Sequence, residues 1–236
     1  MAQLSLLKQL ANFTSSTTGL DLGLRLIHAL TLIGTGIELD SATVMRCSVA
    51  AAQIGLARRY LRFFDFLGCF LNVQDILATG NATKTRTQIL DMAESSALGM
   101  YLVLEGTTML HDMNVHLVSW YTPVLLEAYK FWFYAICIAI TRTTLDLFFG
   151  TVTPIYHNGS ADANEKKGEK SSASSPSEPP ILSTASLLNQ LVIDSLNLTI
   201  PGSLLGWIPV SDMGVAIAML ASTILVWPAV WRKAQK

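Results

Sequence analysis

Charged residues are scarce in this chain of 236 residues. Asp, Glu, Lys and Arg make up 14% of it, against about 25% in soluble domains, while hydrophobic residues make up 51%. The formal net charge of −1 provides no general attraction to nucleic acid, so we expect no nucleic-acid partner. This composition favours a membrane protein over a soluble one.

Motifs for catalysis and cofactor binding are also missing from the sequence. Its three cysteines, Cys47, Cys69 and Cys137, are far apart, which argues against a disulfide framework or a metal site. No glycine-rich phosphate loop, Cys-x-x-Cys pair or nucleophile elbow occurs. His111 and His116 are not at the i, i+4 spacing of a helical metal site. We therefore expect no catalytic residue, no metal and no cofactor, and the chain is predicted not to be an enzyme.

One long uncharged run stands near the C-terminus, from Met213 to Trp231. As a helix it would cover roughly 28 Å, close to the hydrocarbon thickness of a bilayer. Trp227 and Trp231 stand where an interfacial aromatic belt is expected, and Arg232 and Lys233 follow directly. The run predicts a transmembrane helix whose basic end, the C-terminus, faces the cytosol.

A possible second span lies within residues 97–141. The apolar stretch 117–140 is interrupted by Glu127 and Lys130, which are three residues apart and can pair on one helix face. The uncharged run after them, 131–140, is too short to cross a bilayer alone. The sequence leaves open whether this segment crosses within a bundle or lies partly submerged.

An aromatic and aliphatic stripe marks the helix predicted over about 41–77. At 100° per residue, seven side chains fall within an arc of about 120°. These stripe residues are Leu56, Tyr60, Phe63, Phe64, Leu67, Phe70 and Leu71. Arg58 and Arg62 lie opposite the stripe, and Arg59 lies at its edge. This pattern is typical of a helix in the lipid interface, with the stripe inserted and the three arginines on anionic lipid. A core-facing helix with a solvated basic face fits the same pattern.

The amino-acid composition changes abruptly, from apolar to polar, in the segment 157–180. Apart from prolines it has no hydrophobic side chain larger than alanine, so we expect a disordered polar linker. It would separate a helical membrane-associated region, 1–156, from a C-terminal amphipathic segment and span, 181–236. The predicted fold class is an all-α membrane protein. It combines an amphipathic helical N-terminal part, one C-terminal transmembrane helix and a second span or submerged helix.

Four segments resemble those of the peroxin-eleven family of peroxisomal membrane-elongating proteins. Residues 18–25, with Asp21 and Arg25, are similar to its Thr-Gly-Arg-Asp-Lys-x-x-Arg signature. Residues 57–63 resemble its Arg-Lys-x-x-Arg helix, and residues 101–105 its Tyr-x-x-x-Asp segment. The stretch from Gly214 through Ser222 to Trp227 resembles its glycine-rich final span. The order of these segments covers nearly the whole chain.

The resemblance implies an integral protein of the peroxisomal membrane that elongates the organelle before fission. It implies as partners a bilayer with anionic lipids, further copies of the chain, and fission machinery made of a dynamin-type GTPase and its adaptor. The chain departs from the family where Leu20 and Leu22 replace basic residues, where Asp65 stands at a commonly basic position, and where Glu105 replaces Asp. An alternative function is a pore for small metabolites, lined by Glu105 or Glu127.

Overall fold

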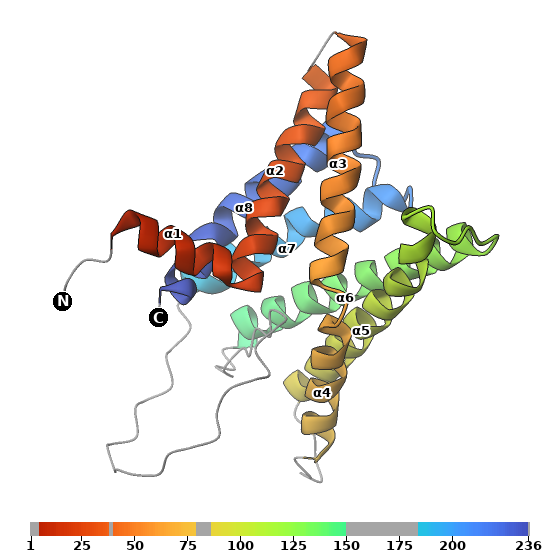
Figure 1. Ribbon diagram of the computed structural model, residues 1–236. Helices are drawn as coiled ribbons and strands as arrows, with labels where there is room; N and C mark the ends of the chain where they lie inside the picture. The colour runs from red at the N-terminus through yellow and green to blue at the C-terminus, as the bar shows by residue number, and fades with distance from the viewer. Residues whose placement is uncertain (1–4, 38–39, 79–85, 150–183, 236) are drawn as a thin grey trace.

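The computed structural model describes residues 5–37, 40–78, 86–149 and 184–235, which are helical and contain no strand (Figure 1). The predicted all-α membrane class is confirmed, whereas the predicted linker at 157–180 lies outside the described residues. The helices are α1 (Leu6–Ser15), α2 (Thr17–Ile37), α3 (Ser41–Leu61), α4 (Asp65–Ala78), α5 (Arg86–Asp112), α6 (Tyr121–Phe149), α7 (Thr184–Leu204) and α8 (Asp212–Ala234).

Sequential helices pack in pairs, α2 with α3, α5 with α6, and α7 with α8 (Figure 1). Helix α2 also lies along α8, and α6 lies along α7, so the C-terminal pair joins the other two pairs. Helix α3 also contacts α5 directly, which connects the α2–α3 pair with the α5–α6 pair, and α4 packs on α5. Helices α2 and α8 run antiparallel, because Gly36 approaches Met213 while Phe13, just before α2, contacts Trp227 and Trp231.

Three of the described helices are long and apolar enough to cross a membrane: α2, α6 and α8. Helix α8 contains the predicted run 213–231. Helix α6 covers residues 121–140 of the second predicted stretch, 117–140, and extends to Phe149, while residues 97–112 belong to α5. Helix α2 was not predicted as a span; it carries Asp21 and Arg25 in its first half.

The prediction of one continuous helix over 41–77 is wrong. Helix α3 ends at Leu61 and α4 begins at Asp65. Between them the backbone N–H groups of Arg62 and Phe63 donate to carbonyls three residues back, each at 3.2 Å. This tighter turn ends one helix and redirects the chain, so that α4 runs along α5.

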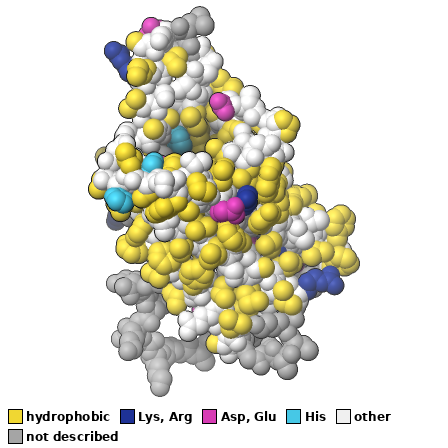
Figure 2. All heavy atoms as spheres, turned by 90° about the vertical axis from the view of Figure 1, so that its right-hand side faces the viewer, with side chains coloured by type: hydrophobic (Ala, Val, Ile, Leu, Met, Phe, Trp, Pro, Cys, Tyr) yellow, Lys and Arg dark blue, Asp and Glu magenta, His cyan; other side chains and the backbone are white. Residues whose placement is uncertain are grey.

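Small side chains fill several of the contacts between the helices, and many large apolar side chains face outward. Ala128, Ala216, Ser222 and Thr223 are fully buried. Many leucine, isoleucine and phenylalanine side chains are exposed, and Figure 2 shows hydrophobic side chains spread over a whole face of the molecule. Close helix approach through small residues, with apolar groups outside, is typical of helices packed in lipid.

Candidate functional site

Six of the seven stripe residues lie exposed at the end of α3, in the turn and on α4; Leu56 is half-buried. Phe64 is the most open, with 68% of its surface exposed, followed by Leu67 at 51% and Leu71 at 50%. On α4, Leu67 and Leu71 are one helical turn apart and therefore lie on the same side of the helix. We call Phe64, Leu67 and Leu71 the outer edge of the stripe.

The inner edge of the stripe packs on two glycines of α5. A Cβ atom at Gly106 would stand 3.3 Å from the Phe63 ring, and one at Gly99 would stand 3.2 Å from the Phe70 ring. The two glycines are seven residues, or two helical turns, apart on α5, and Phe63, in the turn, is also seven residues before Phe70. The two phenylalanine rings therefore pack the turn and α4 against α5, while the side chains of the outer edge remain exposed.

The arginine of α3 nearest to α2 is paired with a carboxylate inside the protein. Arg58 Nε lies 2.9 Å from Asp21 Oδ1, and only 12% of the Arg58 side chain is exposed. One turn further along α2, Arg25 donates to Asn197 Oδ1 of α7 at 2.5 Å and to Ser222 Oγ of α8 at 2.8 Å. These three contacts tie α2 to α3, α7 and α8.

Two further arginines, Arg59 of α3 and Arg62 in the turn after it, reach α5. Arg59 Nε lies 3.2 Å from Glu105 Oε1, and its Nη1 contacts Asp112. Arg62 Nη2 lies 4.0 Å from Glu105 Oε2, while Tyr101 donates its hydroxyl proton to Glu105 at 2.8 Å. Burial alone would lower the pKa of Arg59, but Glu105 and its other neighbours outweigh burial and raise it. Glu105 is thus a buried carboxylate shared by two arginines.

These contacts define an arginine cluster, which the sequence did not predict. Its members are Arg25, Arg58, Arg59 and Arg62 with Asp21, Glu105 and Asp112. The arginines predicted to contact lipid point to carboxylates of α2 and α5 instead, so lipid contact by them stays a prediction. The sequence did contain one signal of this cluster. Glu105 is a charged residue within apolar sequence, and such a residue indicates an oppositely charged partner inside the protein.

A second polar group, the acidic cluster, joins α5, α6 and α7. Arg142 Nη1 lies 2.9 Å from Glu94 Oε2 and also contacts Asp91, while Asp146 and Asp194 act on it electrostatically. Burial raises the pKa of Glu94 to about 7, against the pull of Arg142. Burial likewise raises the pKa of Asp194 to about 6. Four carboxylates here share one arginine.

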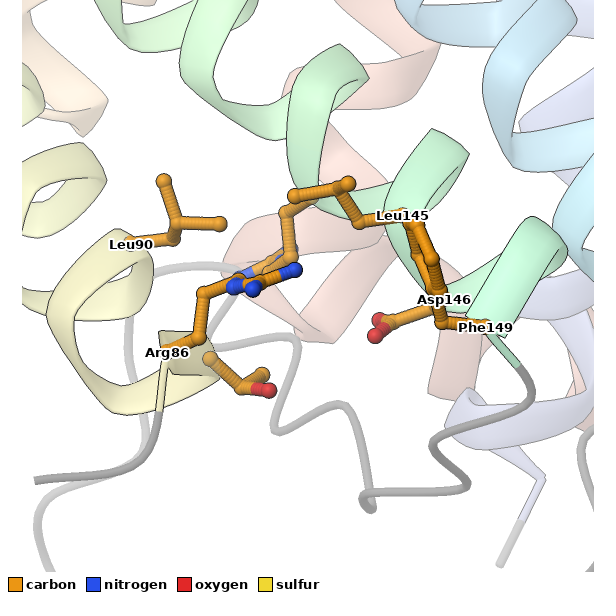
Figure 3. Close-up of a pocket in the computed structure, with 7 residues that line it drawn as sticks. Arg86, Leu90, Leu145, Asp146 and Phe149 are labelled. Carbon is orange, nitrogen blue, oxygen red and sulfur yellow. The ribbon is translucent and has the colours of Figure 1, made fainter.

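A cavity of about 320 Å³ opens beside the acidic cluster, where α5 begins and α6 ends (Figure 3). The Arg86 guanidinium stands 5.8 Å from the centre of the Phe149 ring. Leu90 and Leu145 supply apolar lining, and Asp146 lies on the α6 side. The lining of this cavity thus combines two arginines, Arg86 and Arg142, with one carboxylate, Asp146.

The remaining predicted residues lie at helix surfaces or ends. Glu127 and Lys130 pair at 2.6 Å on the exposed side of α6, as their spacing predicted. Trp227 and Trp231 contact Phe13 of α1, and Met213 contacts α2 at the other end of α8. Exposed Arg232 and Lys233 close α8. In the described part of the chain no group of His, Cys, Asp and Glu side chains is arranged to hold a metal ion.

One protein family matches almost the whole chain. The family described as peroxisomal biogenesis factor 11 (PEX11) matches residues 7–231. The chain belongs to this family. PEX11 membership implies a role in peroxisome biogenesis at the peroxisomal membrane, and this is a family of biogenesis factors rather than enzymes. No curated protein and no solved structure matches the chain significantly.

The segments that resemble PEX11 signatures meet in the arginine cluster. Asp21 from the first segment pairs with Arg58 from the second, and Arg59 pairs with Glu105 from the third. Ser222 from the final span accepts from Arg25. The signature residues in this PEX11 chain therefore link four helices, α2, α3, α5 and α8, through two ion pairs and one hydrogen bond.

Proposed function

We propose that this chain shapes the peroxisomal membrane by inserting the α3–α4 turn and α4 into the cytosolic leaflet. The outer edge of the stripe carries the proposal, because Phe64, Leu67 and Leu71 are each at least half exposed. Leu67 and Leu71 are also four residues apart on α4, on the same side of that helix. Removing such side chains from water is favourable by about 25 cal/mol per Å² of apolar surface. A wedge in one leaflet expands that leaflet and favours positive curvature.

The packing of α4 supports insertion as a fixed wedge. Helix α4 is seated on α5 by the Phe63–Gly106 and Phe70–Gly99 contacts. Helix α5 in turn packs along α6, a candidate span. The depth and angle of the wedge are therefore set by a neighbouring helix that can cross the bilayer.

The arginine cluster supports the same proposal by positioning the turn. The Arg58–Asp21 pair holds the end of α3 level with the beginning of α2, and Arg59 and Arg62 hold it against α5. A lipid phosphate would have to compete with these carboxylates for the arginines. Arg62 has the most exposed side chain and the longest ion pair, so we assign it the first anionic-lipid contact.

The ends of the chain indicate which leaflet the wedge enters. Asn12 and Gln9 bond to Gln235, so the N-terminal helix and the C-terminal helix end side by side. Arg232 and Lys233 favour a cytosolic position for that side, and the beginning of α2 lies there with the α3–α4 turn. Ends on one side require an even number of crossings. If α2 crosses, α3 must cross back, because the α3–α4 turn lies level with the beginning of α2. A crossing of α8 then requires one further crossing between the turn and α8, for which α6 is the apolar candidate.

Self-association completes the proposed mechanism. One wedge bends a bilayer little, so several copies must gather to give an elongated membrane. We propose that such assemblies then attract the dynamin-type GTPase and adaptor that the family resemblance implies.

The pore alternative is less well supported by the same residues. Glu105 is 6% exposed and is already paired with Arg59 and Arg62. Glu127 lies on the outer surface of α6 with Lys130. These two glutamates lie in different environments and do not line a shared passage within one chain.

The proposal is tested by reconstituting the full-length chain into anionic vesicles and imaging them. Leu67→Glu places a charge on the outer edge and is expected to abolish tubulation, since a carboxylate is costly in the acyl region. Leu67→Met is the matched control, because it keeps an apolar side chain of similar volume at the same exposed position, and tubulation should persist. If the Leu67→Glu chain still forms tubules, the wedge mechanism is wrong. Solute flux measured on the same vesicles reports the pore alternative separately.

A further inference from the structure

Helix α1 has a second apolar surface, separate from the stripe. Leu6, Leu7 and Leu10 are 69%, 80% and 41% exposed. At 100° per residue they fall within an arc of about 100°. Lys8 and Ser15 are exposed on the opposite side of the helix. This short helix is therefore amphipathic, and its leucines are not used by the fold.

A third side of α1 fixes the helix to the end of α8. Phe13 is 3% exposed, with its ring centre 4.8 Å from that of Trp227 and 5.2 Å from that of Trp231. Gln235 donates its side-chain amide to the Gln9 carbonyl at 2.8 Å, and Asn12 reaches Gln235 as well. Figure 1 shows α1 leading away from the bundle beside the C-terminus.

The corner between α1 and α2 holds this placement. The Gly19 backbone N–H donates to Ser16 Oγ at 3.1 Å, which caps the beginning of α2. A Cβ atom at Gly19 would stand 2.1 Å from the Phe13 carbonyl oxygen, so this close approach requires glycine. The direction of α1 is thus set by its own corner as well as by the tryptophans.

We propose that α1 is an interfacial helix whose leucines enter the leaflet at the C-terminal end of α8. The level of α1 carries this inference: it lies against Trp227 and Trp231, followed by Arg232 and Lys233, which is where a span meets the headgroups. An amphipathic helix at that level places its apolar side among the acyl chains and its polar side in water. The partner is the lipid surface, and the inference does not depend on insertion of α4.

The experiment measures the depth of single labels on α1 in the full-length chain. Cys47, Cys69 and Cys137 are replaced by alanine, and an environment-sensitive fluorophore is attached at Leu7→Cys. The matched control carries the label at Ser15→Cys, on the exposed polar side of the same helix. Both proteins are reconstituted in vesicles of phosphatidylcholine with a minor fraction of phosphatidylserine. Each label is exposed in turn to a spin-labelled lipid and to aqueous iodide.

The label at position 7 should show a blue-shifted emission, quenching by the spin-labelled lipid and loss of iodide quenching, while position 15 shows the reverse. Equal iodide quenching at both positions would place the leucines in water and overturn the proposal. A position-7 label shielded from both quenchers, with cross-linking between copies, would assign the surface to a second copy and also overturn it. Vesicle tubulation tests the α4 wedge separately, so the failure of one proposal is distinguishable from failure of the other.

Discussion

The arginine cluster and the acidic cluster differ in how the charges of their arginines and carboxylates are balanced. The first places four arginines against three carboxylates, mostly through direct ion pairs. The second surrounds Arg142 with four carboxylates. Nearly matched charges can stay ionised and hold helices together, whereas excess carboxylates in a buried place favour taking up protons. The arginine cluster is therefore expected to act as a fixed clamp, and the acidic cluster to respond to pH.

The largest effect is expected from removing the shared carboxylate of the arginine cluster. Glu105→Ala leaves Arg59 and Arg62 without it in a buried place, which should lower the free energy of unfolding by about 3–5 kcal/mol. Denaturant unfolding in mixed micelles, followed by circular dichroism, measures the change. Glu127→Ala removes an exposed carboxylate and should leave stability unchanged within error. Equal losses in the two variants would show that the cluster is no clamp.

The acidic cluster should give the next largest effect, visible as a pH dependence. The Glu94 pKa is raised from 4.5 to about 7, so the folded chain keeps a proton that the unfolded chain has released. The contribution of Glu94 to stability is therefore greatest below pH 4.5 and is lost as the pH rises to about 7. Glu94→Gln should flatten the fall in unfolding midpoint across that window. Parallel curves for the original chain and Glu94→Gln would contradict this, and Glu127→Gln serves as the control.

The smallest effect should come from the more exposed edge of the arginine cluster. Asp21→Asn keeps the shape of the side chain but removes the charge that pairs with Arg58. Because 23% of the Asp21 side chain is exposed, water can replace part of the lost interaction, and we expect a loss of about 1 kcal/mol. The same unfolding measurement checks it. A loss as large as that of Glu105→Ala would remove the distinction between the core and the edge of the cluster.

Sequence periodicity could locate the stripe but not the shape of the chain that carries it. Leu67, Phe70 and Leu71 lie on α4 as an exposed set, which the periodic pattern allowed. The pattern missed the turn at 62–64, because Arg62, Phe63 and Phe64 include no proline or glycine to mark a helix end. Packing on α5 and the ion pairs of α3 account for the turn, and both depend on residues far along the chain.

The arginines show the same limit for the candidate site. A helical wheel places Arg58 and Arg62 on the polar side of one helix, where contact with solvent or lipid is the natural interpretation. Their carboxylate partners, Asp21 and Glu105, lie on other helices. Without knowing which helices are neighbours, the sequence could not separate a lipid-binding face from an internal clamp.

The sequence by itself determined that this chain is helical and belongs in a membrane, because scarce charge and a run such as 213–231 make apolar helices the stable state in lipid. The order of its signature segments also determined the family. Only the tertiary structure decided which charges meet, since Arg25 and Ser222 are 197 residues apart and an ion pair or hydrogen bond acts over a few ångströms. Antiparallel packing of α2 on α8 brought those residues together, and with them the two ends of the chain.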